Sequence, residues 1–123
     1  MTDEDVGTKN PSDVVACLVE ILGARLVAVI ADVEHTRTVR EWLEDRAPEG
    51  KKLHVLRFAL RVAAAIESRF GAHVAQSWFQ GLNHHLSDRA PALLLKCANE
   101  AQIDVITDVE KSVLNALWNF LAN

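Results

Sequence analysis

The chain has 123 residues, of which 50% are hydrophobic and 24% are charged, and its formal net charge is −4. This length suits one domain or a tight pair of subdomains, and the apolar content is enough for a core, which excludes global disorder. The negative net charge argues against a protein that coats nucleic acid without specificity.

The N-terminal segment, MTDEDVGTKN, is acidic, whereas a secretory signal begins with basic residues and continues into an apolar stretch. No apolar run approaches the roughly 18–20 residues of a membrane span. Cys17 and Cys97 are far apart in the chain, which is typical of small apolar packing residues in a reducing compartment. We therefore expect a cytoplasmic protein without membrane contact, and a flexible acidic segment over residues 1–11.

Two helices are predicted first. Residues 12–22 carry apolar side chains at helical spacing after a cap at Asn10 or Ser12, and Gly23 stands where a helix would end. Residues 24–33 are apolar nearly all round, which predicts a buried helix.

A short amphipathic helix follows. Thr36 can cap it, and Val39, Trp42 and Leu43 recur at the spacing of one inward face. The segment 48–50, which contains a proline and a glycine, ends it.

The most periodic stretch is residues 51–70, which predicts a long helix ended by Gly71. A further short helix, 72–80, is ended by Gly81. We expect a boundary near residues 69–72, which separates a first half, 12–70, from a second half, 71–123.

In that second half Ser87 is expected to cap a leucine-rich helix with Pro91 in its first turn, and a last helix runs from about Asn99 to the C-terminus. Only the segment 103–107, IDVIT, is a plausible strand, and its surroundings favour helix. The fold class predicted is all-α, with about seven helices.

No enzymatic or metal chemistry is expected. A helical zinc site needs two histidines four residues apart, or closely spaced Cys and His ligands, and none of the five histidines fits that spacing. His84 and His85 are adjacent, so their side chains should point apart as exposed loop residues. Motifs for an activated serine, a dinucleotide and a P-loop are also missing, so neither a cofactor nor a metal is predicted.

Residues 22–45 have the layout of a helix-turn-helix: a buried helix, a turn of about four or five residues, and a short amphipathic helix whose start can enter a major groove. The surrounding segment 37–61 is basic, with seven basic and four acidic residues. The side chains expected to face DNA are Thr36, Arg37, Thr38, Arg40 and Glu41, while Arg46, Lys51 and Lys52 hold the phosphate backbone. The alternative is a helical hairpin that binds no DNA, because Glu41 and Glu44 would repel phosphate.

Three blocks resemble the Xre/MbcA/ParS antitoxins of bacterial type II toxin–antitoxin modules. TRTVREWLED, residues 36–45, is similar to the recognition-helix block TR-x-VR-x-W of actinobacterial members. WFQGLNHHLSDRAPALLL, residues 78–95, is similar to the signature of their toxin-binding domain, and residues 113–123 resemble its closing helix. The chain departs from that pattern at Asp32 and Asp45, where relatives often have glycine, and Asp32 should still tolerate a left-handed turn.

The resemblance implies an Xre-like helix-turn-helix followed by a small helical domain that binds a RES-type toxin, an enzyme that consumes NAD. It implies that the antitoxin covers the toxin's active site, often represses its own operon at operator DNA, and forms a homo-oligomer, a dimer or larger. The candidate toxin contacts are Asn83, His84, His85, Arg89, Trp118 and Phe120. Trp118 and Phe120 could equally pack in the protein's own core.

Two other interpretations remain open. The chain could be a stand-alone transcriptional regulator that kept the fold without a toxin, and it would then bind DNA with a steep dependence on salt. It could also be a purely structural helical scaffold, which would bind neither DNA nor toxin.

Overall fold

The computed structural model describes residues 3–44 and 46–122, and within these ranges the chain is helical without any strand. The helices are α1 (Asp3–Thr8), α2 (Pro11–Leu22), α3 (Ala24–Ile30), α4 (Thr36–Glu44), α5 (Gly50–Phe70), α6 (Ala72–Gln80), the 3-10 helix η1 (His84–Leu86), α7 (Pro91–Ala98) and α8 (Ile103–Ala122). The all-α prediction is confirmed, and the segment 103–107 is the start of a helix.

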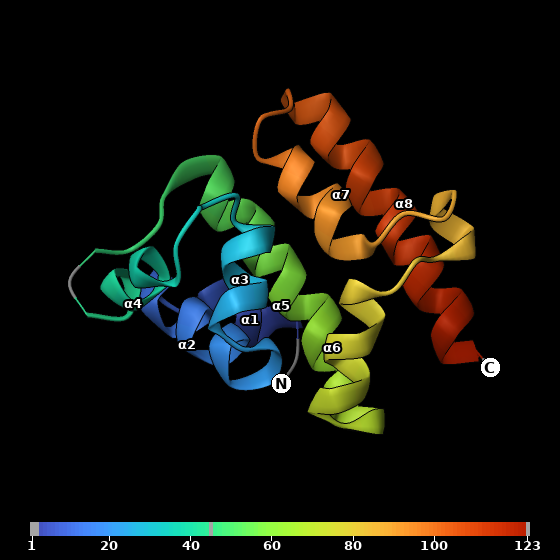
Figure 1. Ribbon diagram of the computed structural model, residues 1–123, viewed down its shortest axis with the longest axis horizontal. Coiled ribbons are helices and arrows are strands. Elements are labelled where there is room, and N and C mark those ends of the chain that lie inside the picture. The colour runs from blue at the N-terminus through green and yellow to red at the C-terminus, as the bar shows by residue number, and fades with distance from the viewer. Residues whose placement is uncertain (1–2, 45, 123) are drawn as a thin grey trace.

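Helix α5 lies in the middle of the molecule, with α2, α3 and α4 on one side and α7 and α8 on the other (Figure 1). It packs against α2 and α6, and also against α1 and α8. Nine of its residues are buried, among them Leu56, Leu60 and Ile66, which are fully buried. Gly71 ends it with a φ of 90°, a backbone conformation that L side chains rarely adopt. One long helix therefore contributes buried side chains to both halves of the chain.

Helix α2 begins as the sequence indicates. The side-chain oxygen of Asn10 accepts a hydrogen bond from the backbone N–H of Asp13 at 2.9 Å, which satisfies one of the free amides of the first turn. Asn10 is thus the cap, and Ser12 has another role. Its Oγ donates to the carbonyl oxygen of Trp42 at 3.0 Å, which ties α2 to α4.

Part of the segment 1–11, for which flexibility is predicted, is helical in the described residues. Residues 3–8 form α1, and Val6 is only 1% exposed in the core. A guanidinium nitrogen of Arg57, on α5, donates to the carbonyl oxygen of Val6 at 2.7 Å. Met1, Thr2 and Asp45 lie outside the described residues.

The connection between α6 and α7 differs from the prediction. Ser87 does not cap α7: its φ is 56°, in the left-handed region, and the N-cap position is Ala90, which makes no side-chain cap. Pro91 opens the helix as expected, because its fixed φ suits the first turn and its missing N–H is not needed there. None of the described helices combines the length and the apolar character that crossing a membrane requires.

Candidate functional site

The site begins with helix α3, the turn over residues 31–35, and helix α4. Asp32 sits in the turn with a φ of 58°, so aspartate occupies the left-handed position expected of it. Two distant side chains then hold the end of α3. The Nζ of Lys52 donates to the carbonyl of Ala31, and the Nδ2 of Asn99 donates to the carbonyl of Ile30 at 2.7 Å. These bonds satisfy carbonyl groups that the helix end leaves free.

Helix α4 is anchored by its inward face. Val39 is fully buried and Trp42 is 7% exposed, and the helix packs against α2 and α3. Leu43, for which the sequence predicts an inward position as well, is exposed. The bond from Ser12 to the Trp42 carbonyl adds a fixed point near the last turn. Because α3 and α4 are both held from several directions, the surface between them has a defined shape.

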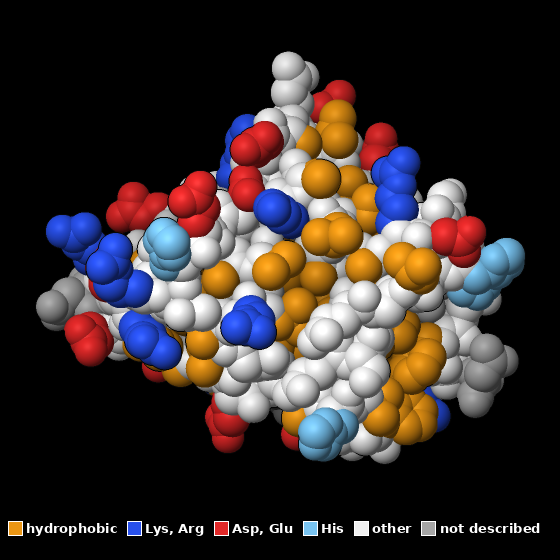
Figure 2. All heavy atoms as spheres, in the orientation of Figure 1, with side chains coloured by type: hydrophobic (Ala, Val, Ile, Leu, Met, Phe, Trp, Pro, Cys, Tyr) orange, Lys and Arg blue, Asp and Glu red, His pale blue; other side chains and the backbone are white. Residues whose placement is uncertain are grey.

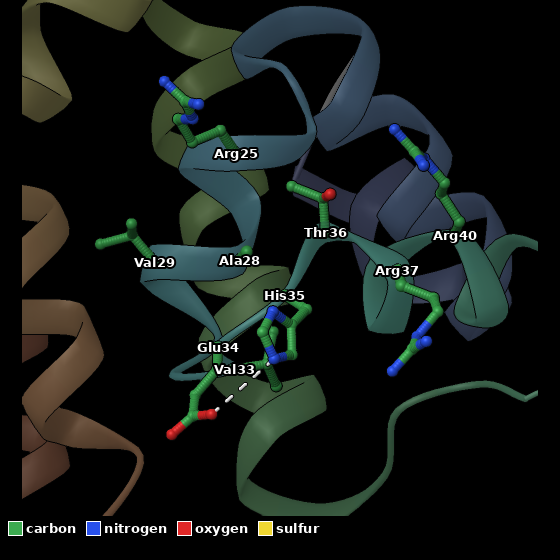
Figure 3. A pocket seen from close by; sticks show the side chains of 9 residues that line it. All are labelled: Arg25, Ala28, Val29, Val33, Glu34, His35, Thr36, Arg37 and Arg40. Carbon is green, nitrogen blue, oxygen red and sulfur yellow. Dashed lines mark ion pairs between the residues drawn. The ribbon is translucent and has the colours of Figure 1, made fainter.

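An open groove of about 550 Å³ lies between the two helices. It is lined by Arg25, Ala28, Val29, Val33, Glu34, His35, Thr36, Arg37 and Arg40. Thr36 and His35 lie between Arg25 of α3 on one side and the two arginines of α4 on the other (Figure 3). The lining holds three arginines and a single carboxylate, that of Glu34, whose Oε2 is 3.9 Å from the Nε2 of His35. The groove is therefore positively charged.

Three of the predicted DNA-facing residues, Thr36, Arg37 and Arg40, line this groove. Thr38 is partly buried, and Glu41 is exposed on α4 outside the groove lining. Arg25 was not among the predicted set. Its signal in the sequence is that it is the only charged residue of the otherwise apolar helix α3, ARLVAVI, and a charge there must lie on the open side.

The residues predicted to hold phosphate differ in whether their side chains bond to another described residue of the protein. Arg46 is exposed. The Nζ of Lys51 donates to the carbonyl of Ala101 at 2.9 Å, and Lys52 holds the end of α3. Both ammonium groups are thus engaged with the protein's own backbone, where they join α5 to the segment between α7 and α8 and to α3.

Basic side chains gather at one end of the molecule. Figure 2 shows Lys and Arg side chains over the end that carries α3 and α4, with Asp and Glu side chains among them. The opposite end shows a larger share of apolar surface in the same view. The excess of positive charge in the groove rests on its lining, which holds three arginines and one glutamate.

The candidate toxin contacts on the loop after α6 form a closed turn. The side chain of Asn83 accepts from the backbone N–H of His85 at 2.9 Å, and the backbone N–H of Asn83 donates to the carbonyl of Arg89 at 3.1 Å. His84, His85 and Arg89 are exposed around it. The prediction that the two imidazole rings point apart is wrong. Their centroids are 5.4 Å apart in an edge-to-face arrangement. No cluster of three or more potential metal ligands occurs in the described part of the chain.

The two C-terminal aromatic candidates lie in different surroundings. Phe120 is partly buried, with its ring centroid 5.4 Å from that of Phe70 and 6.3 Å from that of Trp78. Trp118 is 68% exposed and lines an apolar groove of about 520 Å³ between α5 and α8. Of these two residues, Phe120 therefore packs within the protein and Trp118 is open to solvent. Helix η1 also packs against α8.

This geometry offers two surfaces with different chemistry. The groove between α3 and α4 presents guanidinium groups to an anionic or hydrogen-bonding partner, and the groove between α5 and α8 presents an exposed tryptophan to a protein. No protein-family model, curated protein or solved structure matches this chain.

Proposed function

We propose that this chain is an antitoxin-like protein that binds DNA through α3 and α4 and neutralises a RES-type, NAD-consuming toxin through its C-terminal half. The groove shared by Arg25, Arg37 and Arg40 is the observation that carries the DNA-binding part. The toxin-binding part is supported by the resemblance of residues 78–95 and by the exposure of Trp118.

The DNA-binding part follows from the chemistry of arginine at the start of a helix. Arginine donates paired hydrogen bonds to phosphate oxygens and to the O6 and N7 atoms of guanine. Among the described residues, the side chains of Arg25, Arg37 and Arg40 make no hydrogen bond or ion pair, so DNA would displace no existing partner. Backbone N–H groups at the start of α4 suit a phosphate at the same edge.

The toxin-binding part follows from surface chemistry, because an inhibitor that covers an active site needs contact residues and no catalysis. Exposed tryptophan and arginine side chains carry most of the binding energy in many protein interfaces. Trp118 is open, and His84, His85 and Arg89 surround a turn that is braced by Asn83. Occlusion by this surface would block the toxin without any group on the antitoxin reacting.

A stand-alone regulator of the same fold is the second candidate, and the same basic groove supports it. The two candidates share DNA binding and differ in whether a RES-type partner binds. Two experiments therefore separate them.

The first experiment measures DNA affinity. The DNA upstream of the gene is titrated with the full chain by fluorescence anisotropy at 50 and 200 mM salt, chosen because phosphate contacts make affinity fall steeply with salt. We expect Arg37→Ala and Arg40→Ala each to weaken binding about tenfold, which is the size of one lost arginine contact. Arg89→Ala removes the same charge from an exposed position in the other half and should change affinity less than about twofold. Undetectable binding by the unmodified chain at 50 mM salt would exclude the stand-alone regulator and the DNA-binding part of the antitoxin proposal, and it would leave toxin binding to the second experiment.

The second experiment measures inhibition. A RES-type enzyme encoded beside this gene is co-expressed with the chain, and cellular NAD is followed. We expect NAD to be preserved by the unmodified chain, and Trp118→Ala to weaken the complex by about 30-fold, as for an interface hot spot. Leu43→Ala, a change in an exposed apolar residue of α4, serves as the control and should leave inhibition intact. Continued NAD loss with the unmodified chain would contradict the antitoxin proposal and favour the regulator.

A further inference from the structure

Helix α4 presents one exposed face with an unusual order of charges. Arg37, Arg40, Glu41 and Glu44 are all exposed, and they lie opposite the buried Val39 and Trp42. The arginines come in the first half of the helix, and the carboxylates follow. The face that would enter a major groove therefore carries both an arginine and, one turn later, a glutamate.

Arg37 and Glu41 are four residues apart, so their side chains lie one above the other on the same line of the helix. They do not pair with each other within 4.0 Å, and neither side chain bonds to another described residue. The helix rises 1.5 Å per residue, which separates the two positions by about 6 Å, close to the rise of two base pairs. Each side chain can therefore meet a different base pair of one short site.

A carboxylate on this face is unfavourable beside phosphate, so its favourable partners in a major groove are the amino groups of bases. Cytosine offers its N4 amino group and adenine offers its N6 amino group. Beside the adenine amino group stands N7, an acceptor that repels a carboxylate, whereas the neighbouring atom of cytosine is a carbon. Glutamate at this position thus favours cytosine over adenine.

We propose that Glu41 determines base specificity by accepting a hydrogen bond from the N4 amino group of a cytosine, while Arg37 donates to the O6 and N7 atoms of a guanine within about two base pairs. This inference rests on the proposed DNA-binding function of α3 and α4. On this inference, the carboxylate of Glu41 weakens nonspecific attraction to DNA and at the same time selects the binding site.

The test selects binding sites from a random pool of duplex DNA with the full chain and with two variants. The unmodified chain is expected to enrich a short motif with a cytosine close to a guanine. Glu41→Gln places both a donor and an acceptor at the same point, which matches the N6 and N7 atoms of adenine. We expect its motif to change from cytosine to adenine at that one position, with the affinity ratio of the two sites changing roughly tenfold.

Glu44→Gln is the matched control, because it removes the same charge from the same face nearly one turn further from the start of α4. It should bind all DNA slightly more tightly and enrich the motif of the unmodified chain. Circular dichroism checks that each variant is folded.

The outcomes separate this inference from the function on which it rests. A motif that is the same for Glu41→Gln and the unmodified chain would overturn the role of Glu41 and leave DNA binding standing. Binding without any enriched motif would overturn it as well, because no base would then be selected. If the unmodified chain binds no DNA, the proposed DNA-binding function fails and the role of Glu41 fails with it.

Discussion

Asp32 shows how a single residue shapes the surface between α3 and α4. It is one of three non-glycine residues with positive φ in the described part of the chain, the others being Ser87 and Asp88. A left-handed conformation costs most L residues about 1–2 kcal/mol, and aspartate tolerates it better than most. Replacing Asp32, which lies in the turn between α3 and α4, should therefore change the free energy of unfolding.

We expect Asp32→Ala to lower the free energy of unfolding by about 1 kcal/mol, because alanine has no polar group to offset the left-handed conformation. Asp32→Gly should leave it unchanged or raise it by a few tenths of a kcal/mol, since glycine adopts positive φ without steric cost. Urea unfolding followed by circular dichroism measures both. An alanine variant as stable as the glycine variant would show that the turn is not strained at this position.

At the scale of elements, α1 is the clearest case of structure that local pattern does not reveal. Its six residues, DEDVGT, contain one apolar side chain, and such a segment has no stable helix of its own. The helix forms where Val6 enters the core and its carbonyl accepts from Arg57, a residue 51 positions away. Packing of α1 against α5 thus provides the stabilisation that the six residues of α1 lack on their own.

We expect Val6→Ala to lower the free energy of unfolding by about 1.5–2 kcal/mol, from lost apolar burial and the small cavity left behind. Val105→Ala makes the same chemical change in α8 at a side chain that is 47% exposed, so it should cost less than about 0.5 kcal/mol. Chemical denaturation of the two variants gives the comparison directly. Equal and small effects would mean that α1 contributes nothing to stability.

At the scale of the whole molecule, α5 joins the two halves. The boundary predicted after residue 70 coincides with the end of α5, yet this helix packs against α2 on one side and against α6 and α8 on the other. Lys51 and Arg69 add bonds from α5 to the carbonyls of Ala101 and Leu121, at 2.9 Å each. A core that both halves share should unfold as one unit.

We therefore expect a single cooperative transition. Trp42 lies in the first half, while Trp78 and Trp118 lie in the second, so variants that keep one of these tryptophans and replace the others by phenylalanine report on each half separately. Their fluorescence transitions in urea should coincide with each other and with the loss of helical circular dichroism. Two separated midpoints would show instead that the halves are independent domains.

Local patterns in the sequence are enough to predict the helical class and several helix ends. Gly23 and Gly71 end α2 and α5 as predicted, because apolar spacing and glycines act within a few residues of one another. The sequence leaves the cap of α2 open between Asn10 and Ser12, and α4 ends at Glu44, before the predicted end at 48–50. The prediction that Ser87 caps a helix is wrong, because Ser87 lies in a left-handed turn that a backbone hydrogen bond from Asn83 to Arg89 closes.

Which side chains share a surface is set by how the helices pack together. This packing brings Arg25 to the groove of α4, engages Lys51 and Lys52 with carbonyl groups, and leaves Trp118 open while Phe120 packs beside Phe70. These outcomes depend on which helix faces meet, and that is set by packing between residues far apart in the chain. Periodicity shows that a helix has an apolar face, but it does not show which neighbour covers that face.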